Sequence, residues 1–279
     1  MISPKKILWR GKSSTEMECR VDISFDTDDG ATESYLSKEA ITSESYDGTM
    51  RHTHMYRYSE VLSAQFTLTK DNEEEFTREE NRIMLAWLTS KKTNGLLSVY
   101  FENPDSPEYE LIGNFTAVEQ EKLGNNGIIG YTCTFECISP YAYSPVRKYS
   151  YNVANSLSFI INSYSDEYDS FIYPKITITT KATTDVSIAN NSVTIIDSTS
   201  EGDKEVPVVM VLKNNVAAET IVIDGMNKII YSDKPNRVIG DDFSWTSWLP
   251  LMTGKNELTV DGACTVTFEW REPRKVGSI

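Results

Sequence analysis

The residues best suited to acid–base or metal chemistry are the two histidines of the chain, His52 and His54. On a β-strand this spacing puts both rings on one face. Tight metal binding needs further ligands, which folding would have to bring in from Asp, Glu or Cys. A serine triad would also have to use one of these histidines, and no Gly-x-Ser-x-Gly motif accompanies them. The pair favours a surface or packing role, so we expect no catalytic residue, no metal site and no cofactor.

Paired carboxylates are the next candidates, and they occur at Glu73–Glu75, Glu79–Glu80 and Asp241–Asp242. A glycosidase needs two carboxylates across a cleft, and sequence spacing alone does not place them so. Runs of this kind are typical of solvated surfaces. Glu79 and Glu80 also suit the first turn of a helix, where the helix dipole favours negative charge. The carboxylates therefore indicate no hydrolase.

Two tryptophans, Trp245 and Trp248, flank a short polar stretch late in the chain. An exposed tryptophan ring can stack on a sugar, so these two residues are the candidate carbohydrate contacts. The alternative is that both rings close the open end of a β-sandwich core. The sequence favours closure of the core, and a carbohydrate-binding β-sandwich module remains the alternative function.

Charge and cysteine content exclude several classes of protein. The 279 residues carry a net charge of −14, and no basic stripe is present, which argues against a nucleic-acid-binding surface. None of the four cysteines forms a Cys-x-x-Cys pair, so buried thiols and synthesis in a reducing compartment are expected. The N-terminus lacks the apolar run of a signal peptide, and no stretch is long enough to span a membrane. We expect a protein made in the cytoplasm without membrane insertion.

Most of the chain alternates with period two, which predicts a mostly β fold. The clearest predicted strands have an apolar residue at every second position; they lie at 64–69, 131–137 and 264–270. Further strands are predicted at 175–179, 186–189, 193–196, 220–223, 228–231 and 257–260. Turn signals at Asn125–Gly127, Asp224-Gly225 and Asp261-Gly262 predict three hairpins.

One segment has helical spacing instead. Thr77 and Glu80 match a capping box, and Ile83, Met84, Trp87 and Leu88 then recur at helical intervals. This pattern predicts a single helix from about Thr77 to Ser90 whose apolar stripe packs on the first sheet.

The prolines at 140 and 145 predict a boundary between an N-terminal domain, residues 1–143, and a C-terminal domain, residues 144–279. Within the C-terminal domain, the segment 152–169 is rich in Ser, Asn and Tyr and is interpreted as a crossing connection. The polar stretch 24–50 predicts a long loop or an extended hairpin, which is a common place for partner contacts.

Two sets of motifs converge on one family. The first set is Trp87-Leu88 at the end of the helix, a turn at Asn103-Pro104-Asp105, and the strand Tyr131–Cys137 followed by Ser139-Pro140-Tyr141. The second set lies late in the chain and comprises Ile223-Asp224, Lys228–Tyr231, Gly240–Phe243, Trp248–Pro250 and Gly254–Val260. In order and spacing the chain resembles the distal tail proteins of long, non-contractile bacteriophage tails. Where these proteins carry Pro-Gly before the Asn, this chain has Thr253-Gly254, which conserves the turn chemistry.

The resemblance implies a structural protein of the virion tail tip with no enzymatic activity. It implies an N-terminal β-sandwich or barrel with one α-helix that builds a homo-hexameric ring, and a C-terminal galectin-like β-sandwich that projects outward. The implied partners are the tail tube protein, the tail-associated hub protein and receptor-binding or baseplate proteins. DNA would pass through the ring lumen without specific binding, in keeping with the net charge of −14.

Overall fold

The computed structural model describes residues 3–24, 38–44, 51–103, 105–124, 127–197, 204–235 and 237–276, with backbone alone for 44, 51–54 and 197. The chain divides into two compact units, Met1–Pro145 together with Arg274–Ile279, and Val146–Pro273. This division places the change of unit between residues 145 and 146, and it returns the C-terminal residues to the first unit. The mostly β architecture predicted from the period-two patterns is confirmed.

The first unit is built on a nine-stranded sheet with the strand order β2-β1-β7-β8-β9-β6-β3, to which β10 and β21 add beside β8. Its strands are β1 (Lys6–Trp9), β2 (Lys12–Ser13), β3 (Cys19–Ser24), β6 (Ser63–Lys70), β7 (Gly95–Tyr100), β8 (Tyr109–Leu123), β9 (Gly127–Cys137), β10 (Ala142–Tyr143) and β21 (Pro273–Arg274). All strand pairs whose register is described are antiparallel.

One aromatic core fills the first unit. The sheet curls so that β1 and β3, near opposite ends of the strand path, contribute to the same buried cluster. The Trp9 ring makes edge contacts, 5.5 Å between centroids, with both Phe115 and Phe135, and those two rings lie 5.1 Å apart. Edge-to-face pairs of this kind add about 0.5–1.5 kcal/mol each beyond the area that they bury.

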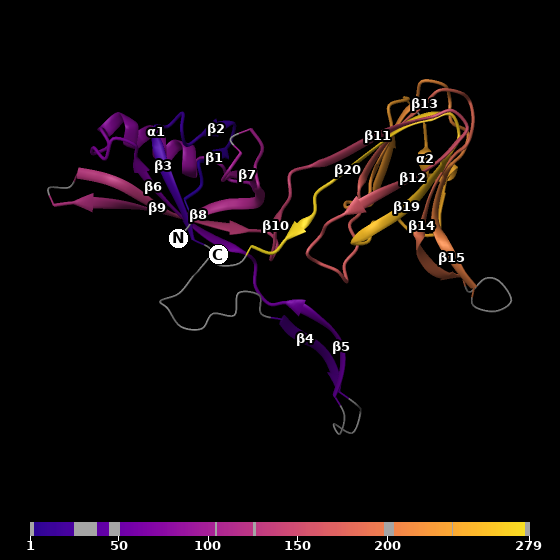
Figure 1. The fold of residues 1–279 in the computed structure, drawn as a ribbon, viewed down its shortest axis with the longest axis horizontal. Helices are drawn as coiled ribbons and strands as arrows, with labels where there is room; N and C mark the ends of the chain where they lie inside the picture. Colours follow the sequence, from indigo (N-terminus) through magenta and orange to yellow (C-terminus); the bar gives the residue numbers. More distant parts are fainter. Residues whose placement is uncertain are drawn as a thin grey trace. The chain divides into compact units, whose positions relative to one another are not determined.

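The helix α1 (Arg78–Thr89) covers this core, as predicted (Figure 1). Thr77 is its N-cap, and the capping box with Glu80 is present. Met84, Trp87 and Leu88 are buried, and the indole Nε1 of Trp87 donates to the Trp9 carbonyl at 2.9 Å. Ile83, which the sequence placed on the same stripe, is 38% exposed because it lies on the edge of the buried face.

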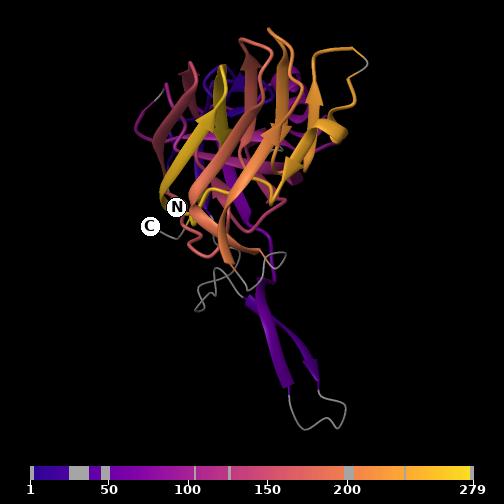
Figure 2. The same cartoon turned by 90° about the vertical axis from the view of Figure 1, so that its right-hand side faces the viewer.

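The second unit is a β-sandwich of two five-stranded antiparallel sheets, seen from the side in Figure 2. One sheet has the order β11 (Arg147–Val153), β20 (Cys264–Trp270), β13 (Lys175–Thr180), β16 (Thr220–Asp224) and β17 (Ile229–Ser232). The other has the order β12 (Ser156–Ser163), β19 (Gly254–Asp261), β14 (Val186–Asp197), β15 (Lys204–Leu212) and β18 (Phe243–Trp245). Both sheets contribute to one apolar core, and the short helix α2 (Ile239–Asp242) precedes β18.

The structure corrects three predictions on this unit. Asp261-Gly262 is no hairpin turn, because β19 and β20 belong to different sheets and the turn carries the chain from one sheet to the other. Gly262 suits this crossing because its φ is +103° and a Cβ atom would lie 2.4 Å from the Asp185 carbonyl oxygen. The two short strands at 186–189 and 193–196 are one strand, β14, with a register shift between Asn190 and Thr194. The interpreted crossing connection contains β12, which pairs with β19.

The remaining two strands form a separate two-stranded sheet, β4 (Lys38–Glu44) with β5 (Arg51–Tyr58). The sequence predicted a loop or an extended hairpin from residue 24 to 50. Of this stretch the structure describes residue 24 and residues 38–44, and the rest lies outside the described residues. Residues 38–44 form β4, and its partner β5 lies beyond the predicted range.

Candidate functional site

The β4–β5 hairpin is a two-stranded sheet of its own within the first unit (Figure 1). Its strands pair from Lys38 with Tyr58 to Glu44 with Arg51. Within the described ranges, neither strand pairs with any other sheet. The hairpin is anchored at its base, where the Tyr58 ring makes an edge contact with Tyr141 at 5.4 Å.

Apolar side chains of the hairpin face solvent on both sides of the ribbon. Met55 is 57% exposed and pairs with Ile41, which is 36% exposed. Tyr56, which points to the other face, is 65% exposed. The ion pair of Arg57 with Glu39 is largely exposed and therefore contributes little to stability.

An isolated two-stranded hairpin is marginally stable in water. Its backbone groups and apolar side chains gain most when a partner covers them, because burial stabilises by about 25 cal/mol per Å² of apolar surface. The hairpin is therefore the candidate assembly surface of the first unit.

The two tryptophans singled out from the sequence lie together in the second unit but differ in exposure. Trp245 stacks on Phe243 at 4.6 Å and remains 48% exposed. Trp248 packs against the apolar core and is partly buried, 5.9 Å from Trp245. Trp248 thus closes the sandwich core, whereas Trp245 offers ring surface to a ligand.

A lysine covers the Trp248 side of this aromatic group. The Nζ atom of Lys228 lies 3.1 Å from the centroid of the Tyr173 ring and 5.5 Å from that of Trp248. Partial desolvation lowers the pKa of Lys228. The lysine is held by cation–π attraction, so the Trp248 ring is less available to a ligand than that of Trp245.

Sequence reasoning missed a buried ionic network in this second unit. The guanidinium of Arg237 donates to the fully buried carboxylate of Glu219 and to the side-chain oxygen of the equally buried Asn215. Arg237 also donates to the carbonyls of Lys213 and Asn214. Because the network fixes the chain just before α2 and β18, it positions Trp245. Glu219 and Arg237 are 18 positions apart, so no local sequence signal indicates the pairing.

The carboxylate runs serve local structure. Glu79 forms an ion pair with Arg82, and both side chains are exposed. Glu80 accepts from the backbone N–H of Thr77 at 2.7 Å and from Lys70, and these hydrogen bonds lower the pKa of Glu80 to about 2. Asp242 accepts from the Asn214 side chain at 2.7 Å. These contacts support the interpretation that the runs are structural and solvated.

The histidine and cysteine predictions have different outcomes. The side chains of His52 and His54 lie outside the described residues, although their backbone belongs to β5. The prediction of buried free thiols is confirmed for all four cysteines, and burial raises the pKa of Cys133 and Cys137 to about 12. In the part of the chain that is described, no group of three His, Cys, Asp or Glu could hold a metal ion. No helix in these same ranges is long and apolar enough to cross a membrane.

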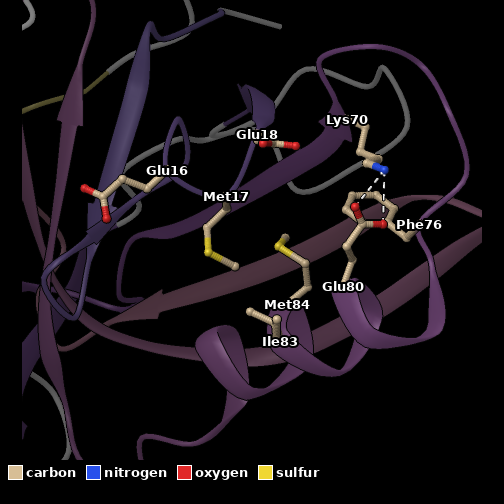
Figure 3. Close-up of a pocket in the computed structure, with 8 residues that line it drawn as sticks. All are labelled: Glu16, Met17, Glu18, Lys70, Phe76, Glu80, Ile83 and Met84. Carbon is tan, nitrogen blue, oxygen red and sulfur yellow. Dashed lines mark hydrogen bonds and ion pairs between the residues drawn. The ribbon is translucent and has the colours of Figure 1, made fainter.

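A pocket opens beside α1 in the first unit, shown in Figure 3. Its volume is about 230 Å³, and it is lined by Glu16, Met17, Glu18, Lys70, Phe76, Glu80, Ile83 and Met84. These side chains come from three separate segments: the turn before β3, the end of β6, and the start of α1 with the residues that precede it. No single stretch of sequence could have indicated it.

Family models match both halves of the chain. The model described as a phage tail protein N-terminal domain matches residues 5–139, and the model described as a phage tail C-terminal domain matches residues 141–270. No curated protein is similar enough in sequence to count as a relative.

Two solved structures of phage proteins match the chain. The Dit protein of SPP1, described as a paradigm of the hub adsorption apparatus in phages that infect Gram-positive bacteria, matches with a TM-score of 0.60 at 11% identity, over 95% of this chain and 98% of that one. A chain of the phage p2 baseplate in its activated conformation matches with a TM-score of 0.46 at 14% identity, over the full length of both chains. At this level of identity the SPP1 match establishes similarity of fold.

Proposed function

Because the chain belongs to the phage tail proteins, with their N-terminal and C-terminal domains in order, we propose that it forms a homo-hexameric ring at the distal end of the tail tube. In this proposal the first unit builds the ring and the second unit projects from it. The ring joins the tube protein to the hub protein and to receptor-binding or baseplate proteins. The assignment to the structural proteins of the phage tail agrees with the similarity to the SPP1 hub component.

The observation that carries the ring proposal is the β4–β5 hairpin. It exposes apolar side chains on both faces, and in the described ranges it belongs to no larger sheet. In a closed ring every subunit can cover its neighbour's projecting element, so no such surface is left to water. A net charge of −14 per copy would also keep DNA from adhering to the ring.

Labelling of intact virions tests the location. An antibody raised against the second unit should label the distal end of the tail in negative-stain electron micrographs. Label along the tube, or on the head, would contradict the proposal. Disrupted virions serve as the control, because they show whether the epitope is hidden in the assembled particle.

A saccharide contact at Trp245 is the second candidate function, and the half-exposed ring of Trp245 favours it. Glycan-array binding should then be lost in Trp245→Ala while the fold is retained. Trp248→Ala is the matched control for structural damage, because Trp248 packs on the core. Absence of any glycan binding by the wild-type chain would dismiss this function.

A further inference from the structure

The pocket beside α1 has the size of a site for one side chain. Its volume of about 230 Å³ is below the roughly 300–1,000 Å³ of pockets that bind small molecules and cofactors. Met17 and Met84 approach it from opposite walls, with Ile83 beside Met84 (Figure 3). Methionine side chains are flexible and polarizable, so this apolar lining can adapt to an inserted chain.

The charged residues of the pocket are unbalanced. Three carboxylates and one ammonium line it, which leaves a net charge of −2. Glu80 is neutralised by Lys70, and the Glu16 carboxylate accepts from the Ser13 hydroxyl at 3.2 Å. The Glu18 carboxylate has neither an ion pair nor a hydrogen bond within the described ranges. The carboxylate without a partner in the lining is therefore that of Glu18, in the turn before β3.

Lys70 shows how this pocket accommodates a basic side chain. Its side chain is only 8% exposed, its Nζ atom lies 3.0 Å from the Glu80 carboxylate, and the same atom lies 5.7 Å from the centroid of the Phe76 ring. The aliphatic stem is thus buried while the charge meets a carboxylate and an aromatic face. Met17, Met84 and Glu18 offer a second basic side chain two of these contacts, an apolar lining for its stem and a carboxylate for its charge. Among the described residues, Lys70 is the only basic residue of the lining.

We propose that this pocket receives a lysine or arginine side chain from a basic partner protein. The aliphatic stem of the inserted residue packs between Met17 and Met84, and its cationic end meets Glu18. A basic partner fits this lining, because its net charge of −2 attracts a cationic side chain. The proposal goes beyond the hexameric ring and does not depend on it, since the pocket is complete within one chain.

Methyl NMR on the full-length chain with ¹³C-methyl methionine tests the proposal directly. The probes are n-butylguanidinium and n-butylammonium, and n-butylurea is the neutral control. The Met17 and Met84 signals should shift with the two cations, with half-saturation in roughly the millimolar range expected of such small ligands. Met226, which is 72% exposed on the second unit, should not respond.

Charge removal completes the experiment. Glu18→Gln should weaken binding of the cations by about threefold, as expected for one partly exposed ion pair, and Glu60→Gln, at an exposed position of the same unit, should not. The proposal would be overturned if butylurea shifted the Met17 and Met84 signals as much as the cations do, or if the cations left both signals unshifted. An unchanged affinity of Glu18→Gln for the cations would also overturn it. Shifts of these two signals with protein concentration alone would identify a second copy as the occupant and would also overturn it.

Discussion

The first unit contains two long antiparallel strand pairs, β8–β9 and β4–β5, that share a backbone pattern and differ in what their side chains meet. Along β9, Tyr131, Cys133 and Phe135 are fully buried, and the residues between them face outward. Along β4–β5, Met55 and Tyr56 are more than half exposed. Strand pairing alone therefore does not decide whether a hairpin is part of a core or a surface for a partner. The side chains on its two faces decide it.

Because of this difference, substitutions in the two strand pairs should have different effects, on stability in one pair and on assembly in the other. A substitution in β8–β9 should act on the free energy of unfolding of the single chain. A substitution in β4–β5 should leave that free energy almost unchanged and act on association instead. Four predictions test this separation, in order of expected effect.

Phe135→Ala should destabilise the first unit by about 3–5 kcal/mol, because it removes a buried ring and leaves a cavity. The ring contacts both Trp9 and Phe115, so neighbouring side chains fill the space poorly. Urea unfolding followed by tryptophan fluorescence measures the loss. Tyr56→Ala is the matched control on the hairpin and should stay within about 0.5 kcal/mol. Equal losses in both variants would remove the distinction between the two hairpins.

Tyr56→Asp should reduce association while the single chain remains folded. An aromatic side chain in the centre of an interface commonly contributes about 2 kcal/mol or more to binding, and a buried charge adds a penalty. Analytical ultracentrifugation should show the assembled species dissociating at concentrations at least tenfold higher than for the wild type. Thr93→Asp, at an exposed position outside the hairpin, is a control for charge alone. Wild-type association by Tyr56→Asp would exclude the hairpin from the interface.

Thr77→Ala should cost about 1 kcal/mol, because the N-cap side chain no longer accepts from the Glu80 N–H. Thr77→Ser retains the hydroxyl and should restore most of the loss. The helix packs on β8, so the loss should appear in unfolding of the first unit and not in association. Thermal unfolding monitored by circular dichroism measures both variants.

Acidification should weaken the same helix start. The pKa of Glu80 falls from 4.5 to about 2 in the folded chain, so its ionised form is favoured by folding. The resulting stability is complete above pH 4.5 and is lost as the pH falls from there toward 2. The difference in unfolding free energy between wild type and Glu80→Gln should shrink over this interval. A difference that does not change with pH would contradict the hydrogen bonds that the Glu80 carboxylate accepts from Thr77 and from Lys70.

Regular patterns carried the successful sequence predictions. The alternation from Tyr131 to Cys137 predicted β9 because one face of a half-buried strand must be apolar. Thr77 and Glu80 predicted the start of α1 because a capping box is a local interaction between residues three apart. Both signals lie within a few residues, so tertiary structure did not have to be known.

The failures involve residues that meet only after folding. Asp261-Gly262 has the residue types of a hairpin turn, and nothing local shows that β19 and β20 join different sheets. The alternation of β12 is interrupted, because Ile160 occupies an exposed position and Ser163 a buried one. Of the candidate assembly hairpin, only β4 lies in the polar stretch singled out from the sequence, and the exposed Met55 and Tyr56 lie beyond it. The pocket around Met17 and Met84 was not predicted, because its walls come from distant segments.

The solution mass of the purified full-length chain tests the central claim most directly. Mass photometry and light scattering should be run over a concentration series, with the tail tube protein absent and then present. The account predicts a species of about 190 kDa, six copies of the 31.6 kDa chain, that Tyr56→Asp disfavours. A chain that stays at 31.6 kDa at every concentration, with the tube protein present as well as absent, would contradict it.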